Sequence, residues 1–236
     1  MGQIINELTQ DIRFQEGMHA CINCGTCSAI CPAAEFYNYD PRQLMVDVQS
    51  NSEEKIIELL KSETIWYCGE CMSCKTRCPR NNTPGLVIMA LRALSQKLGY
   101  FTASEKGRQQ LVLKRTVGEW SLHYGYCMYP ADLTTENFPE QGPIWDWEHK
   151  NLAEVMERLG ANYEGDGEGV LRRIPKETLE ELHKIFEVTG GLLRFENIEK
   201  CSKAKAKEMG MEFDETHHNE YFGHIFTSNN GHHSKD

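Results

Sequence analysis

Apolar residues recur every three or four positions in three stretches between residues 40 and 100, which is the spacing of helices with one buried face. Each stretch follows a helix-start signal, namely Asp40 before Pro41, Ser52 before two glutamates, and Thr83 before Pro84. The apolar positions that we expect to be buried are Leu44, Met45 and Val48, then Ile56, Leu59 and Leu60, then Val87, Leu91, Leu94 and Leu98. Gly99 is placed to end the third helix. The first hundred residues are therefore predicted to be mostly helical.

The pattern after residue 100 predicts two amphipathic helices that end at Gly160 and Gly190, and a third over residues 196–209. Their expected apolar positions are Leu152, Val155 and Leu159 in the first and Leu179, Leu182, Ile185 and Phe186 in the second. Residues 123–150 are rich in aromatic and turn residues, which predicts an irregular connector. No segment sustains the alternation of a strand, so the predicted fold class is mainly α.

The predicted domain organisation has three parts: a domain over residues 1–100, a helical and irregular extension over 101–215, and a flexible tail over 216–236. A hydrophobic content of 40% with 25% charged residues is typical of a globular chain. The formal net charge of -10, most of it after residue 100, argues against nucleic acid or an anionic membrane as partner. A short basic run, Lys75, Arg77 and Arg80, either balances nearby anionic groups or faces an acidic partner.

The cysteines change this picture, because eight of the ten lie between Cys21 and Cys78. They form two runs with the same spacing, C-x2-C-x2-C-x3-C-P, over residues 21–32 and 68–79. In two-cluster ferredoxins three cysteines of such a run bind one [4Fe-4S] cluster and the fourth binds the other cluster. The predicted ligands of the first cluster are Cys21, Cys24, Cys27 and Cys78, and those of the second are Cys68, Cys71, Cys74 and Cys31. The crossed fourth ligands would tie the two halves of the domain together.

Zinc is the alternative cofactor, but four thiolates complete one structural zinc site, and two runs of four are the pattern of iron-sulfur clusters. Gly25 and Gly69, each next to a ligand, either allow backbone N–H groups to approach the cluster sulfurs or only form turns. Trp66 and Tyr67 precede Cys68 and either shield the second cluster or pack in the core.

We expect a cytoplasmic protein, since eight closely spaced thiols suit a reducing compartment. No apolar run reaches the roughly 18 residues of a membrane span, and the first residues lack the apolar stretch of a signal peptide.

No catalytic site is expected in this chain. A nucleophile with a neighbouring base, a phosphate loop and a GxGxxG motif are all missing, and the glycines of residues 165–169 have the wrong spacing for phosphate. Cys127 and Cys201 are isolated and are predicted to be small buried apolar groups. The remaining candidates are histidines that either bind a transition metal or belong to a solvated tail: His217, His218, His224, His232 and His233.

The stretch from Gly17 to Gly99 resembles HdrC, the iron-sulfur electron-transfer subunit of heterodisulfide reductase. The resemblance rests on EGMHACINCGTCSAICP, DPRQL, SETIWYCGECMSCKTRCPR and a helix that starts at TPG. It implies an α-helical ferredoxin domain with two [4Fe-4S] clusters held by the eight cysteines. It also implies a hetero-oligomer, in which this chain passes electrons between HdrA, a flavin- and cluster-bearing protein, and HdrB, whose CCG motifs hold catalytic noncubane clusters. The long acidic extension looks most like the HdrC of the heterodisulfide reductase-like complex of sulfur-oxidising prokaryotes.

Two other functions remain open. One is the iron-sulfur subunit of another dehydrogenase, of the succinate, glycerol-3-phosphate or lactate type, since those subunits contain a similar helical domain. The other is a stand-alone ferredoxin-like carrier. We expect the acidic extension to be a docking surface for a partner protein, since it has amphipathic helices and aromatic residues without ligands.

Overall fold

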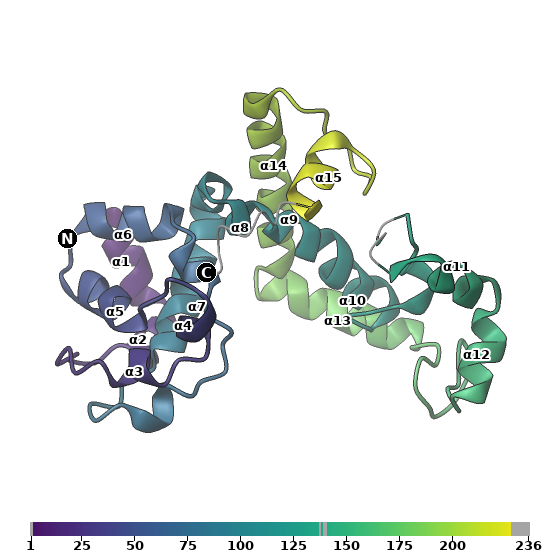
Figure 1. Ribbon diagram of the computed structural model, residues 1–236, viewed down its shortest axis with the longest axis horizontal. Helices are drawn as coiled ribbons and strands as arrows, with labels where there is room; N and C mark the ends of the chain where they lie inside the picture. Colours follow the sequence, from purple (N-terminus) through teal and green to yellow (C-terminus); the bar gives the residue numbers. More distant parts are fainter. Residues whose placement is uncertain (1, 137, 139–140, 228–236) are drawn as a thin grey trace. The chain divides into compact units, whose positions relative to one another are not determined.

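A computed structural model describes residues 2–136, 138 and 141–227 (Figure 1). In that part of the chain all regular secondary structure is helical, which confirms the predicted mainly α class. The chain divides into two compact units, the first running to Gln110 and the second covering Leu111–Phe226.

Helices of different lengths make up the described part of the first unit. They are α1 (Gln3–Gln10), α2 (Ile12–Gly17), α3 (Thr26–Ala29), α4 (Ala33–Phe36), α5 (Pro41–Gln49), α6 (Glu53–Lys61), α7 (Pro84–Leu98) and α8 (Glu105–Arg108), with 3-10 turns at Thr64–Trp66, Lys75–Arg77 and Tyr100–Ala103. The two cysteine runs lie in the segments between α2 and α4 and between α6 and α7.

The predicted helix starts of α5 and α6 are confirmed. The Asp40 side chain accepts hydrogen bonds from the N–H groups of Arg42 at 3.0 Å and Gln43 at 3.2 Å, so it caps α5. Ser52 caps α6 by accepting from the Lys55 N–H at 3.4 Å. α7 has no side-chain cap, but Pro84 opens it and Gly99, with φ of +77°, ends it in the left-handed conformation.

The core of the first unit forms where α7 packs against α1, α2, α5 and α6. Most of the predicted apolar positions are buried there, namely Leu44, Met45, Val48, Ile56, Leu60, Val87, Leu91 and Leu94. Leu59 is only partly buried against this core. Leu98 has 38% of its surface exposed, because it lies in the last turn of α7. The core also continues beyond the predicted boundary at residue 100, since Phe101 is fully buried in the turn that packs on α6 and α7.

The second unit consists of helices linked by long loops. They are α9 (Gln110–Leu113), which begins at the unit boundary, a π-helical turn (Lys114–Gly118), α10 (Glu119–Tyr124), α11 (Pro143–Lys150), α12 (Leu152–Arg158), α13 (Lys176–Val188), α14 (Gly191–Met209) and α15 (Glu220–Thr227), with a 3-10 turn at Pro130–Asp132. α13 packs against α10 and α14.

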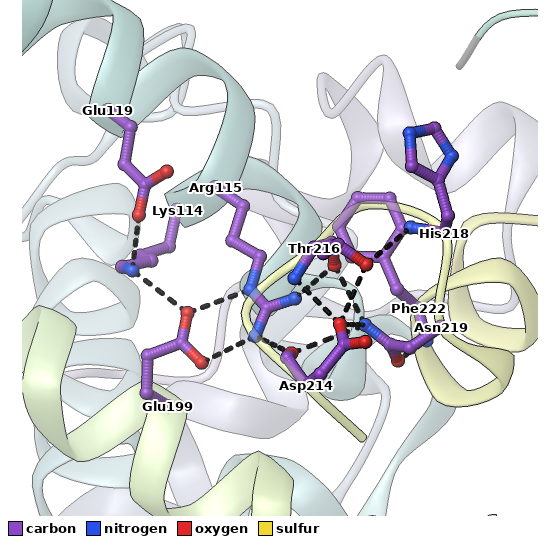
Figure 2. Close-up of polar contacts among 9 residues, drawn as sticks. All are labelled: Lys114, Arg115, Glu119, Glu199, Asp214, Thr216, His218, Asn219 and Phe222. Atoms are coloured by element: carbon purple, nitrogen blue, oxygen red, sulfur yellow. Dashed lines mark hydrogen bonds and ion pairs between the residues drawn. The ribbon is translucent and has the colours of Figure 1, made fainter. Parts of the chain in front are cut away.

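A buried arginine holds three segments of the second unit together (Figure 2). Arg115, which is 1% exposed, donates two hydrogen bonds of 2.8 Å to the Glu199 carboxylate of α14. It also donates to the carbonyls of Thr216 at 2.5 Å and Asp214 at 2.7 Å, in the loop before α15. Burial alone would raise the pKa of Glu199, but the hydrogen bonds from Arg115 and Lys114 outweigh it and lower that pKa. The buried charge is therefore paired with Glu199, and all three guanidinium nitrogens donate hydrogen bonds.

Several sequence predictions for the second unit differ from the structure. Leu159 is 73% exposed because it follows the last residue of α12, and Met156 is the buried residue of that helix. α13 has no fully buried residue, and α14 begins at Gly191 instead of residue 196. Part of the expected connector forms α11.

The expected tail contains a packed helix, α15, with Tyr221, Phe222 and Ile225 buried. The rest of that tail, residues 228–236, lies outside the described residues. In the described part of the chain, no helix is both long enough and apolar enough to pass through a bilayer.

Candidate functional site

The two cysteine runs share left-handed residues at the same two positions, although the first run continues into α3 and the second into a 3-10 turn. Asn23 and Glu70, each just before the second cysteine of its run, have φ of +57° and +54°. Gly25 and Met72, each just after that cysteine, have φ of +80° and +58°. Two left-handed residues flanking the second cysteine wrap each run around its thiols. The shared spacing therefore corresponds to a shared loop shape.

Hydrogen bonds to sulfur are also repeated in the two runs. The N–H groups of Asn23 and Glu70 each donate to the first thiol of the run, Cys21 or Cys68, at 3.4 Å. The second cysteine of each run is exposed and lies 3.4 Å from a hydroxyl, Cys24 from Thr26 and Cys71 from Ser73. These hydroxyls lower the pKa of both thiols, which favours the thiolate form that binds iron.

Four of the predicted ligands line one pocket although they come from both runs. Cys21, Cys24 and Cys27 of the first run line it together with Cys78 of the second. Burial raises the pKa of Cys27 to about 11, so a metal would have to displace its proton. This is the set predicted for the first cluster.

The other four cysteines also lie near one another. Burial raises the pKa of Cys68, and the neighbouring Cys31 thiol of the first run adds to that increase. Burial likewise raises the pKa of Cys74, with smaller contributions from Cys68 and Cys71. These interactions link Cys68 with Cys31 and Cys74, and Cys74 with Cys71, which together are the set predicted for the second cluster.

Polar side chains hold the first run in place. Gln49 accepts from the Cys21 N–H at 2.6 Å and donates to the Cys21 carbonyl at 3.1 Å. Arg42 donates to Asn23 at 2.9 Å. Asn82 donates to Cys78 Sγ from its backbone N–H at 3.2 Å and from Nδ2 at 3.6 Å. Gln49 and Arg42 thus join the first run to α5, and Asn82 holds Cys78, the fourth ligand predicted for the first cluster.

One arginine holds the second run. Arg92 of α7 donates to the carbonyls of Ile65 and Cys68, each at 2.6 Å, and to the Glu70 carboxylate at 2.5 Å. Its guanidinium also lies 5.6 Å from the centre of the Trp66 ring. α7 therefore fixes the conformation of the loop as well as filling the core.

Aromatic rings cover the second run on the core side. Tyr37 stacks on Tyr67 with ring centres 4.8 Å apart, and Tyr39 meets Tyr67 edge to face at 6.3 Å. Trp66 and Tyr67 pack against the hydrophobic core, and so does Cys68. Packing against the core is therefore confirmed for Trp66 and Tyr67, and shielding of the second cluster stays a prediction.

The donor set fits iron-sulfur clusters. All eight thiols are free. No three Cys, His, Asp or Glu side chains among the described residues converge on a position for one metal ion. A cubane cluster requires no such convergence, because each of its four irons binds a different thiolate and the ligands surround a larger body. The residues of each set would supply four thiolates, one per iron.

Comparison with known proteins agrees with this fit. The HdrC subunit of the ferredoxin:CoB-CoM heterodisulfide reductase of Methanosarcina acetivorans is 31% identical over 202 residues, which are 83% of this chain and 70% of the relative. The chain belongs to the HdrC family of heterodisulfide reductase subunits. A family model described as a 4Fe-4S dicluster domain matches residues 17–82, which contain both cysteine runs.

Other members of the HdrC family are similar over a shorter length. An iron-sulfur HdrC subunit of the CoB–CoM heterodisulfide reductase of Methanocaldococcus jannaschii is 28% identical over 59% of this chain and 71% of its own. The HdrC subunit of the H2:CoB-CoM heterodisulfide,ferredoxin reductase of Methanothermobacter marburgensis is 30% identical over 59% of this chain and 78% of its own. The predicted family and the 4Fe-4S cofactor are thus confirmed.

One of the two glycines singled out in the sequence occupies a left-handed position of the loop. Gly25 has a left-handed φ, whereas Gly69 does not, and an added Cβ at Gly69 would meet no protein atom within 4 Å. The counterpart of Gly25 in the second run is Met72, and the counterpart of Gly69 in the first is Ile22. Sequence position within the repeat, more than residue type, identifies the left-handed sites.

The isolated cysteines and three of the histidines, His217, His218 and His224, belong to the second unit. Cys127 is exposed, contrary to the prediction of burial, and Cys201 is partly buried. His217 stacks on Phe222 with ring centres 5.0 Å apart, so it belongs to a packed region. His218 lies 3.7 Å from Glu136, while His232 and His233 are outside the described residues.

Sequence reasoning missed the side chains that surround the thiols, notably Tyr39, Arg42, Asn82 and Arg92. No pattern in the sequence marks them. The arginines, for example, contact residues 19 to 27 positions away along the chain. The basic run was identified from the sequence. Its residues Lys75, Arg77 and Arg80 are exposed, next to Cys74 and Cys78 along the chain.

Proposed function

We propose that this chain is the electron-transfer subunit of a heterodisulfide reductase or reductase-like complex. Its two [4Fe-4S] clusters would relay electrons between an HdrA-like protein that carries flavin and clusters and an HdrB-like protein with CCG motifs and catalytic noncubane clusters. The observation that carries the proposal is the pocket lined by Cys78 together with Cys21, Cys24 and Cys27, because it joins the two runs. Crossed ligands of this kind hold two clusters close together.

A bound [4Fe-4S] cluster supplies one-electron redox chemistry at a potential set by its surroundings. The residues of this chain hold the clusters, donate hydrogen bonds to their sulfur ligands and exclude water on the core side. Cys24 and Cys71 are exposed, so each cluster would have one ligand at the surface, where a partner's redox centre can approach. No proton transfer by a titratable side chain is part of this role.

Residues 101–215 are the proposed docking region for a partner protein, as expected from the acidic extension. Several large apolar side chains are exposed there: Ile144, Trp147, Ile185, Val188 and Leu193. A chain that ends after Gln110 tests this, because Phe101 is buried in the first unit and a chain that ended at Gly99 would lose its packing. The shortened chain should keep both clusters and lose the partner; retained binding would contradict the docking role.

The test of the main proposal is anaerobic purification of the chain from its own cells. We expect about eight irons and eight labile sulfides per chain, a brown colour bleached by dithionite, and copurification with proteins that have CCG motifs and bind flavin. A chain with far fewer irons would contradict the two-cluster assignment. A fully loaded chain that is monomeric in every extract would favour the stand-alone carrier.

The complex itself is proposed to act on disulfide or sulfur compounds. The similarity to the sulfur-oxidising reductase-like complex remains a prediction. It is tested by supplying the purified complex with either a thiol-derived heterodisulfide or a persulfide and following cluster oxidation and reduction. Reduction of the clusters by the persulfide would support the sulfur-oxidising assignment. Oxidation of the clusters by the heterodisulfide would support a heterodisulfide reductase.

A further inference from the structure

Tyr39 carries a buried hydroxyl with no hydrogen-bond partner. The residue is 5% exposed and belongs to the hydrophobic core of the first unit. Among the described residues, this hydroxyl makes no hydrogen bond of ordinary geometry, although it interacts with the Cys68 thiol. A buried polar group without a partner is costly and therefore calls for an explanation.

The hydroxyl lies beside two predicted ligands of the second cluster. Cys68 and Cys31 are both its electrostatic neighbours, and each comes from a different run. The Tyr39 N–H donates to the Tyr37 carbonyl at 2.8 Å, and the ring packs against Tyr67. The next residue, Asp40, caps α5. The backbone and the ring are thus held on both sides, so the hydroxyl cannot turn to solvent.

We propose that Tyr39 donates a hydrogen bond to the Cys68 thiolate when that cysteine binds the second cluster, and that it thereby raises the reduction potential of this cluster. The inference rests on the proposed function, since it requires Cys68 to be a ligand. A neutral thiol is a weak acceptor, whereas a thiolate bound to iron is a stronger one. Loading of the cluster would therefore give the hydroxyl its missing partner.

The direction of the effect follows from charge. Reduction adds one electron, which makes the cluster and its thiolates more negative. A hydrogen bond to sulfur stabilises the reduced form more than the oxidised form, and such bonds are among the factors that set cluster potentials. Backbone N–H groups donate to the first thiol of both runs, so Tyr39 adds an asymmetry to otherwise similar loops.

The test is an EPR-monitored redox titration of the loaded complex with Tyr39→Phe, which removes only the hydroxyl. We expect one cluster to become harder to reduce. Its equilibrium constant for reduction should fall about threefold to tenfold, a shift of roughly 30 to 60 mV for a one-electron couple. The other cluster should keep its potential. A Cys78→Ser variant, which removes a ligand of the first cluster, identifies the remaining signal as that of the second.

Tyr37→Phe is the matched control, because it removes the same hydroxyl from a partly exposed ring two residues away. It should leave both potentials unchanged. Tyr39→Phe with full iron and unchanged potentials would overturn the inference while leaving the proposed function intact. Loss of the second cluster in Tyr39→Phe would also overturn it, since the residue would then serve only assembly. Absence of iron from the unaltered chain would instead contradict the proposed function.

Discussion

The two cysteine runs share a loop conformation but lie in different surroundings. Around the first run the contacts are polar and partly exposed, with Arg42 and Gln49 joined to the loop by hydrogen bonds. Around the second run the contacts are aromatic and more buried. Arg92 donates to the Cys68 carbonyl, and the Tyr39 hydroxyl interacts with the Cys68 thiol. The same ligand spacing can therefore hold two clusters of one type whose reduction potentials differ. In an electron relay such a difference helps to set the direction of transfer.

The largest effect, a loss of iron, is expected from substituting the fourth cysteine of a run, Cys31 or Cys78. With crossed ligands, Cys78→Ser should lose the first cluster, so that the iron content falls from about eight to about four per chain. Its EPR spectrum should then match that of Cys24→Ser and differ from that of Cys71→Ser. Cys31→Ser should give the reverse match. Cys127→Ser should keep all the iron. If Cys78→Ser instead resembled Cys71→Ser, each run would hold its own cluster.

The second effect concerns the two arginines that support the loops. Arg92→Met should lower the free energy of unfolding by about 2–3 kcal/mol, because it leaves two carbonyls and a carboxylate without a charged donor. Arg42→Met should cost about 1 kcal/mol or less, since Arg42 is more exposed to water. Anaerobic urea denaturation followed by circular dichroism measures both values. Equal losses would show that the two loops depend equally on their arginines.

A smaller effect is expected at the glycines. Gly25→Ala should destabilise the protein by about 1–2 kcal/mol, because the left-handed conformation at φ of +80° is unfavourable for an L-residue. Gly69→Ala, with open space for a Cβ and no left-handed φ, should change the free energy of unfolding by less than about 0.5 kcal/mol. The same denaturation experiment compares them. A larger cost at Gly69 would indicate that the loaded cluster approaches this backbone.

The smallest effect is expected at Asn82, which contacts the fourth ligand of the first cluster. Asn82→Ala removes the Nδ2 donor at 3.6 Å from Cys78 Sγ but keeps the backbone N–H donor at 3.2 Å. The potential of the first cluster should fall by less than about 30 mV, and the second should not change. A redox titration measures the shift. A shift larger than that caused by Tyr39→Phe would contradict the expectation that the side-chain hydrogen bond at the second cluster has the larger effect on potential.

The helix starts could be predicted because they depend on neighbouring residues. Asp40 and Ser52 cap their helices from within three residues, so short-range chemistry decides them. The apolar spacing of α7 likewise identified its buried face, apart from Leu98 in the last turn. In the second unit the same spacing was less informative: α13 is amphipathic yet has no fully buried residue, since burial depends on what packs against a helix.

The sequence alone determined the repeated cysteine spacing, the helix starts beside it and the resemblance to the HdrC family. These follow from residue type and local order along the chain. Only the tertiary structure decided which side chains surround the cysteine loops, such as Arg92 of α7 at Cys68 and Gln49 of α5 at Cys21. The physical reason is that a loop's shape follows from a few consecutive dihedral angles, whereas its hydrogen-bond donors and its burial come from helices that fold against it.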